Sequence, residues 1–241
     1  MAEEWIRQES RGGIVTLVLD GPPVNALDAG RLHHFADIIE RIEARALVIT
    51  SACKVLSAGM NLRTAAAADS AEQARIVDGL NRAFLALYAA PMPTICAAQG
   101  AAIAGGLFFV LASDWRIAGP TAQFGLAEVR VGVDFPAGPL GIAQDVLGPV
   151  EARRLMLPGE PIGAEAALVR GVVDEIAEDA QAAAAAKAEA LAALPAAAYA
   201  RVKSQLRAQS IAAIRAAIAE EDGRAWIDAD ARAAMERMLT R

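Results

Sequence analysis

Residues 93–128, PTICAAQGAAIAGGLFFVLASDWRIAGPTAQFGLAE, constrain the fold of this chain more than any other stretch. The short apolar run Thr94–Ala98 predicts a buried strand, which ends at the glycine of Gln99-Gly100. Ala104-Gly105-Gly106 then leads into the wholly apolar segment Leu107–Ala112. A glycine pair directly before such a segment predicts a buried helix whose first turn consists of backbone alone.

The start of that helix is a candidate site for an oxygen that carries negative charge. The first N–H groups of a helix have no intrahelical partner, and they attract anionic oxygen. Gly105 and Gly106 carry no side chain that would keep a ligand away from the main chain. A tight turn with close packing is the alternative, because a glycine pair by itself is typical of both.

Length and charge narrow the class of protein. A chain of 241 residues, 55% hydrophobic, predicts one large domain or one domain with a small appendage. The net charge of −6 argues against a nucleic-acid partner. The acidic start MAEEWIRQES is unlike a signal peptide, and the longest apolar stretch, Ala101–Ala112, is too short to cross a bilayer. We therefore expect a soluble, cytoplasmic protein without a membrane partner.

Few side chains suit nucleophilic or redox chemistry. Cys53 and Cys96, the only cysteines, lie in apolar runs and are expected to be buried free thiols. His33 and His34, the only histidines, are neighbours on a predicted helix, where they project about 100° apart. We expect both on the surface, so a Ser–His–Asp hydrolase is disfavoured.

Apolar periodicity predicts an α/β chain with a helical C-terminal part. Trp5–Ser10 and Ile14–Leu19 form a predicted hairpin, and Ala46–Thr50 is a strand of the buried, parallel type. Further strands are expected at 115–118, 123–124 and 172–176. Helices are predicted over residues 29–45, 69–88, 142–147, 151–157 and 164–170, followed by alanine-rich helix from 178 with breaks at Pro195 and near Ser210.

Five blocks of sequence, taken in order, resemble the crotonase superfamily, which comprises the enoyl-CoA hydratases and isomerases. The blocks are VNALD (24–28), KVLSAGMNL (54–62), PTICAAQGAAIAGG (93–106), SDWRIAGPTAQFGLAEVRVG (113–132) and LPGEPIGAEAALVRGVVDEI (157–176). The resemblance implies a crotonase (ClpP-like) spiral of ββα units over residues 1–180. It also implies a C-terminal helical trimerisation region over 181–241.

The same resemblance implies an assembly and a substrate. Members usually form homotrimers or dimers of trimers and act on acyl-CoA thioesters, without a metal or a cofactor other than the coenzyme A of the substrate. An amphipathic C-terminal stretch with Ile211, Ile214, Ile218 and Trp226 supports trimerisation, because soluble monomers rarely leave a large apolar face in water.

Two backbone N–H groups stabilise a thioester enolate in this family. The resemblance assigns the first to Met60, which follows the glycine of the SAG motif, and the second to Gly105, beside Gly106, in Ala104-Gly105-Gly106. Two fixed donors in a dry site counter the charge that develops on the thioester oxygen, and removal of one such donor typically costs about 3–4 kcal/mol.

Coenzyme A is expected along the loops 25–27 and 54–60. The resemblance places Ala26 and Ala58 beside the adenine, mostly through backbone contacts. Lys54 and Arg63 are the nearest candidates for phosphate contacts, and ordinary solvated charges are the equal alternative.

The chain departs from the family at one of two glutamates with which hydratases hold a water molecule. Phe108 stands at the first position, whereas Glu128 retains the second. A phenyl ring cannot transfer a proton, and it makes the pocket drier. Family members that shift a double bond work with one glutamate at the Glu128 position, and burial in an apolar pocket would raise the pKa of that carboxyl.

Two alternatives for the acidic residues stay open. Glu128 could be a loop carboxylate paired with Arg130 or Arg116. Asp134, six residues later, could point inward as a second acid, cap the next element or face solvent. Three classes of function follow: an acyl-CoA isomerase or related lyase acting through Glu128, a hydratase in which Asp134 or water replaces the missing glutamate, and a CoA-binding protein without catalysis.

Overall fold

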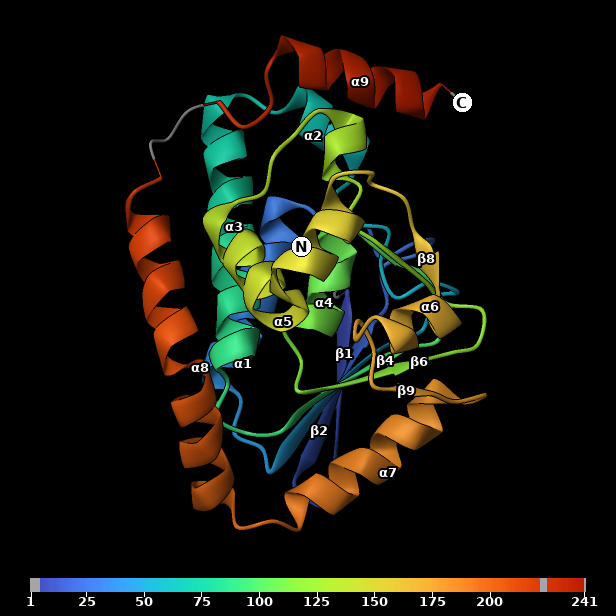
Figure 1. Cartoon of the computed structure of the whole chain (residues 1–241), viewed down its shortest axis with the longest axis vertical. Helices are drawn as coiled ribbons and strands as arrows, with labels where there is room; N and C mark the ends of the chain where they lie inside the picture. The colour runs from blue at the N-terminus through green and yellow to red at the C-terminus, as the bar shows by residue number, and fades with distance from the viewer. Residues whose placement is uncertain (1–4, 222–224, 241) are drawn as a thin grey trace.

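A six-stranded sheet, in the order β1-β2-β3-β4-β6-β9, lies at the centre of the molecule (Figure 1). The structure, a computed structural model, describes residues 5–221 and 225–240. β1 and β2 form the predicted antiparallel hairpin, and each later pair in the sheet is parallel. The strands are β1 (Ile6–Arg11), β2 (Ile14–Leu19), β3 (Ala46–Ser51), β4 (Thr94–Ala98), β6 (Trp115–Ala118) and β9 (Glu175–Ile176).

A second, three-stranded sheet contains β5 (Ala102–Ile103), β7 (Gln123–Gly125) and β8 (Ile162–Gly163). β4 and β6 belong to the large sheet, whereas the strands that follow them, β5 and β7, belong to the small one. Each pair then leads into a helix, α4 (Phe108–Leu111) or α5 (Ala137–Met156). The chain therefore repeats a ββα unit, as the resemblance implied.

Helices cover both faces of the large sheet because its central strands are buried on both faces. All six residues of β3 are buried. α1 (Ala29–Arg41) and α3 (Ser70–Ala89) pack together over one face, in a core that includes Phe35, Phe84 and Phe109. α7 (Ala180–Ala192) covers the other face with alanines at every fourth position, which allows close packing (Figure 1).

Local signals fix where several helices begin and bend. Asp28 and Asp69 cap α1 and α3 by accepting hydrogen bonds from backbone N–H groups of their first turns. The two helices predicted over 142–147 and 151–157 are parts of α5, which is kinked at Gly148, where φ is 67°. The remaining short elements are α2 (Leu62–Ala67), the 3₁₀ turns η1 (Ala104–Leu107) and η2 (Glu128–Val131), and α6 (Ala164–Val169).

The C-terminal helices differ from the prediction in where they break. α8 (Ala196–Ala219) continues through Ser210, whose hydroxyl donates to Asp145 on α5, and α9 (Ala229–Leu239) is a separate helix. α1 ends at Arg41, four residues before the predicted end. Cys96 is buried as predicted, whereas Cys53 is only half-buried.

The predicted apolar face of the C-terminal region packs against the chain itself. Ile214 is buried, and Ile211, Ile218 and Trp226 pack against the main core. These residues therefore give no support to trimerisation. The large apolar side chains that are exposed among the described residues of this region are others, Leu194, Val202, Leu206, Met238 and Leu239. Among the described helices, none is long and apolar enough to cross a membrane.

Candidate active site

An apolar pocket of about 110 Å³ lies where η1, η2, α3 and α9 meet. Glu128 carries the only charged side chain among the described residues that line it. The other lining residues come from segments far apart in the sequence: Ala58, Met60, Leu62, Ala65, Leu80, Ile103, Ala104, Gly105, Phe108, Ala127, Val131, Val133, Phe135, Pro136, Pro139, Trp226, Met235 and Met238.

Glu128 is a buried carboxyl group without a compensating charge. It is the first residue of η2, its exposed fraction is 7%, and its Oε2 has no hydrogen-bond partner among the described residues. Burial raises the pKa of Glu128 to about 8, because ionisation in an apolar pocket loses the hydration of the charge. A group that titrates near neutral pH can both accept and return a proton.

The arginines that could have neutralised Glu128 have other partners. Arg130 pairs with Glu160 at 3.1 Å, and Arg116 pairs with Asp174 at 2.7 Å. The alternative in which Glu128 is a paired loop carboxylate is therefore wrong.

The two predicted backbone donors lie on segments that approach each other closely. Gly59 has a φ of 82°, and a Cβ at that position would lie 3.2 Å from the Gly105 nitrogen and 2.8 Å from the Ile103 oxygen. Met60 follows directly, and both Met60 and Gly105 line the pocket. Ala104 has a φ of 50°, which is uncommon for a residue with a side chain and marks local backbone strain beside Gly105.

Among the described residues, none accepts a hydrogen bond from the Met60 N–H. Its neighbours on both sides pair with Leu27, since the Leu27 N–H donates to Gly59 and the Asn61 N–H donates to Leu27. The Gly105 N–H belongs to the first turn of η1, where the N–H groups have no partner within the helix. Both groups are thus available to an oxygen atom in the pocket.

Asn25 fixes the loops that precede Met60. It is fully buried with a φ of 48°, and its amide nitrogen donates to the Ser51 hydroxyl at 2.7 Å and the Leu56 carbonyl at 2.9 Å. Its own carbonyl accepts from the Ser57 hydroxyl at 2.8 Å. The sequence predicted Asn25 in a loop that binds coenzyme A, but it did not predict that Asn25 links neighbouring loops through hydrogen bonds. The left-handed backbone and the amide side chain of an asparagine make these hydrogen bonds possible.

The predicted coenzyme A residues are divided between the pocket and the surface. Ala58 is exposed and lines the pocket, whereas Ala26 is half-buried and lies outside its lining. Lys54 and Arg63 are exposed and also lie outside it. The structure additionally brings Arg31 to this loop, where its guanidinium donates to the Ala26 carbonyl at 2.6 Å.

Gly106 and Phe108 have different roles in shaping the pocket. Gly106 lies outside the lining of this pocket, and a Cβ there would lie 2.4 Å from the Ser57 oxygen, so this glycine permits close packing, and its contact with a substrate stays a prediction. The Phe108 side chain lines the pocket, with its ring centroid 5.5 Å from Phe84 and 6.4 Å from Phe135.

Asp134 does not join Glu128. It is exposed and lines a second cavity of about 390 Å³, and its carbonyl accepts a hydrogen bond from the Trp226 indole at 3.0 Å. The prediction that Asp134 points inward as a second acid is therefore not supported, because the loop carries Val133 and Phe135 into the pocket in its place.

The sequence patterns missed the part of the pocket that α9 supplies. Met235 and Met238 line the pocket, and Ala231 packs so closely on η2 that a Cβ at Gly132 would lie 3.0 Å from its Cα. The Arg232 guanidinium donates to the Ala66 and Ala68 carbonyls at the end of α2. The amphipathic pattern of α9 predicts a helix with one buried face, but the spacing of its apolar residues does not show on which part of the protein that face packs. In the described part of the chain, no cluster of three metal-ligating side chains occurs.

Comparison with known proteins identifies the family of this chain. A model of the enoyl-CoA hydratase/isomerase family matches residues 9–226. The chain belongs to this family. EchA17 of Mycobacterium tuberculosis, described as a probable enoyl-CoA hydratase, is 32% identical over 173 residues, which are 68% of this chain and 64% of that protein. The match thus spans less than two thirds of the relative's length.

Solved structures of the enoyl-CoA hydratase/isomerase family share the fold. One from Mycobacterium paratuberculosis, described as an enoyl-CoA hydratase/isomerase, superposes with a TM-score of 0.88 over 98% of both chains at 24% identity. Another from Mycobacterium tuberculosis, described as an enoyl-CoA isomerase, has a TM-score of 0.79 and 28% identity, covering 90% of this chain and 96% of the other. The predicted crotonase fold is confirmed.

Proposed function

We propose that this chain moves a proton beside the carbonyl of an acyl-CoA thioester, in double-bond isomerisation or a related lyase reaction, with Glu128 as the single acid/base. The observation that carries this proposal is a lone buried carboxyl in an otherwise apolar pocket. Its pKa of about 8 suits a group that takes a proton and gives it back near neutral pH.

The chemistry divides between the side chain and the backbone. Ionised Glu128 takes a proton from a carbon of the enoyl chain, and the electron pair of that C–H bond moves onto the thioester oxygen as an enolate. The N–H groups of Met60 and Gly105 would stabilise this oxygen. Return of the proton from Glu128 to another carbon re-forms the thioester carbonyl and completes a shift of the double bond. The product is therefore an isomer of the substrate.

Hydration is the less favoured reaction. Addition of water requires a base for the water and an acid for the carbon, and Phe108 occupies the position of the second glutamate in the resemblance. Asp134 lines another cavity, so a hydratase that uses Asp134 has no support from its placement. We expect coenzyme A to lie along Ala26 and Ala58, with Lys54 and Arg63 near its phosphates.

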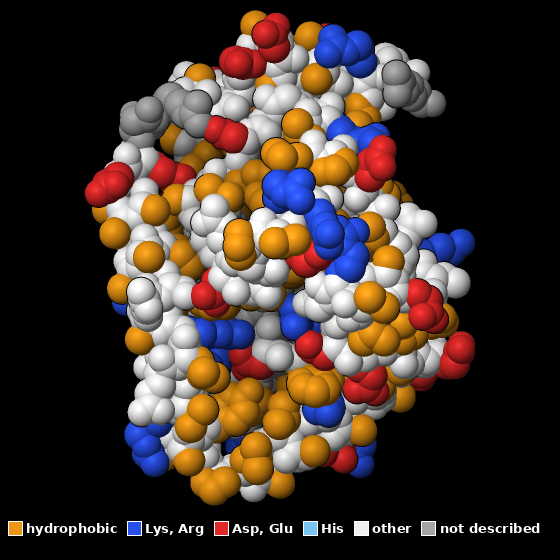
Figure 2. Space-filling view, in the orientation of Figure 1, with side chains coloured by type: hydrophobic (Ala, Val, Ile, Leu, Met, Phe, Trp, Pro, Cys, Tyr) orange, Lys and Arg blue, Asp and Glu red, His pale blue; other side chains and the backbone are white. Residues whose placement is uncertain are grey.

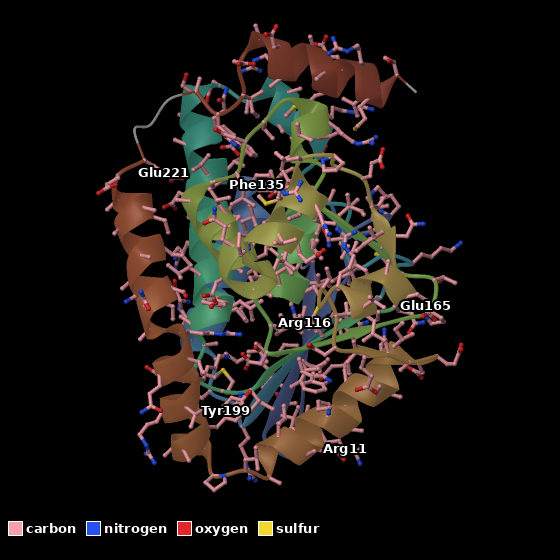
Figure 3. The ribbon with its side chains drawn as sticks, in the orientation of Figure 1. Arg11, Arg116, Phe135, Glu165, Tyr199 and Glu221 are labelled. Carbon is pink, nitrogen blue, oxygen red and sulfur yellow. The ribbon has the colours of Figure 1, made fainter. Side chains whose placement is uncertain are left out.

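Turnover of 3-enoyl-CoA and 2-enoyl-CoA thioesters tests the assignment. Wild type should shift the double bond faster than it hydrates crotonyl-CoA. Glu128→Gln should lower turnover by roughly 10²–10⁴-fold, because proton transfer by a placed carboxylate contributes about that factor, and should leave binding intact. Glu165→Gln is the matched control, since Glu165 is exposed on α6 and points away from the pocket (Figure 3).

Phe108→Glu tests the same assignment from the opposite side. If the missing acid is what suppresses hydration, this variant should hydrate crotonyl-CoA faster than wild type, provided that circular dichroism shows it folded. Wild-type hydration faster than isomerisation would refute the single-acid assignment. Binding of acyl-CoA without any turnover, unchanged in Glu128→Gln, would instead indicate a CoA-binding protein without catalysis.

A homotrimer, or a dimer of trimers, is the assembly we propose. Hydrophobic side chains gather on the lower part of one face, over the region where α7 and α8 meet (Figure 2). Leu194 lies between α7 and α8, Val202 and Leu206 lie on α8, and all three are exposed, with an exposed fraction of 77% for Leu206. A second copy of the chain would remove these side chains from water.

A further inference from the structure

Two neighbouring cavities share one wall. Phe135, Pro136 and Trp226 line both the pocket that contains Glu128 and the second cavity, which has about 390 Å³. In Figure 3, Phe135 is labelled beside the upper part of α3, at about the height of Glu221 near the end of α8. The three residues therefore form a partition between the cavities.

The two cavities on either side of the partition differ in the polarity of the side chains that line them. On one side lie Glu128 and apolar side chains alone. On the other side the lining includes three carboxylate residues, Asp78, Asp134 and Glu221, together with Ser70, Gln73 and Asn81. An alkyl chain is stabilised by burial among apolar groups, so the wild-type acyl group should stop at the partition.

Several contacts hold the partition in place. The Phe135 ring meets Phe108 edge-to-face, with the centroids 6.4 Å apart. The Trp226 indole donates to the Asp134 carbonyl at 3.0 Å. Directly after Pro136, the Ala137 N–H donates to the Glu221 carboxylate at 2.7 Å, which ties the start of α5 to the end of α8. These contacts argue for a fixed wall.

We infer that Phe135 and Trp226 set the length of the acyl group and restrict this chain to short, apolar acyl-CoA thioesters. The pocket volume of about 110 Å³ is smaller than the cavity of about 150 Å³ that accepts benzene, so it has room for roughly six carbons or fewer. This inference rests on the proposed function, since it takes the pocket as the acyl site.

Binding of saturated acyl-CoA esters tests the wall without any turnover. Calorimetry with butanoyl-, octanoyl- and dodecanoyl-CoA should show that wild type binds butanoyl-CoA more tightly than dodecanoyl-CoA. Phe135→Ala joins the two cavities and should bind octanoyl-CoA at least tenfold more tightly than wild type does. Each additional buried methylene should contribute roughly fourfold.

Two controls separate removal of the wall from general damage. Phe135→Leu keeps a large apolar side chain at the partition and should retain the wild-type preference. Glu165→Gln changes an exposed residue on α6 that lines neither cavity, and it should also retain that preference. If Phe135→Ala fails to fold, as judged by circular dichroism, Trp226→Ala removes the same wall from the other side and should show the same gain for octanoyl-CoA.

The possible failures are distinguishable. Wild type that binds all three esters equally well, or a Phe135→Ala variant with unchanged preference, would overturn the wall while leaving the proposed function in place. Absence of binding for every ester would overturn the proposed function and, with it, this inference.

Discussion

Replacement of Glu128 by glutamine should make the stability of the protein less sensitive to pH. Burial raises the pKa of Glu128 in the folded state to about 8, against 4.5 for the free side chain. This difference, at about 1.36 kcal/mol per pKa unit, corresponds to a free energy of roughly 5 kcal/mol. That is a large share of the stability of a typical domain, about 5–15 kcal/mol.

The sign follows from which state holds the proton. Between pH 4.5 and about 8 the folded protein retains the Glu128 proton, whereas the unfolded chain has released it. The free energy of unfolding therefore falls as pH rises through this window, and the decline is complete above the folded pKa. Glutamine binds no proton, so Glu128→Gln should lack this part of the decline.

Urea unfolding at about pH 5.5, 7 and 8.5 measures the free energy of unfolding of wild type and of Glu128→Gln across this window. The free energy of unfolding of Glu128→Gln, relative to wild type, should rise by up to about 1.4 kcal/mol per pH unit across the window. Protomer concentration must be held fixed, because association contributes to apparent stability. Glu165→Gln should keep the wild-type pH dependence. If the free energy of unfolding depended on pH in the same way in wild type and in Glu128→Gln, the raised pKa of a buried, unpaired Glu128 would be refuted.

Other changes have separate expected results. Lys203→Met should lower the free energy of unfolding by about 1–3 kcal/mol in urea melts, because it removes the buried ammonium that pairs with Asp114 at 2.7 Å, while Asp114 keeps Arg207 at 2.9 Å. Gly59→Ala should reduce both stability and turnover, since its Cβ would lie 2.8 Å from the Ile103 oxygen, whereas Gly163→Ala, with nothing within 4 Å, should not. Light scattering should give at least three times the mass of one 25.1 kDa chain, and a monomer mass at micromolar concentration would contradict the proposed assembly.

The sequence predicted the parts of the site that depend on local backbone. The glycine pair at 105 and 106, before an apolar run, indicated where main-chain N–H groups would be free, the resemblance pointed to Met60, and both segments line the pocket. The fold followed from five ordered blocks and is confirmed. The domain boundary at residue 180 stays a prediction, although α7, which begins there, packs on the central sheet.

Predictions that depended on long-range packing were less successful. Asp134 was a candidate for the pocket because of its distance in sequence from Glu128, yet the loop turns Val133 and Phe135 inward and leaves Asp134 exposed. A break near Ser210 was expected, because serine favours helix ends. In the structure its hydroxyl finds a partner on α5, and the helix continues. Neither outcome can be read from spacing, since each depends on a neighbour from another element.

The family match covers most of the residues that line the pocket, but not all of them. The match to the enoyl-CoA hydratase/isomerase family ends at residue 226, whereas Met235 and Met238 line the pocket from α9 beyond it. Glu128, Met60 and Gly105 lie well within the matched region. The family match therefore includes the residues that we propose for the thioester chemistry and the proposed wall residues Phe135 and Trp226, whereas the part of the pocket that α9 supplies lies outside it.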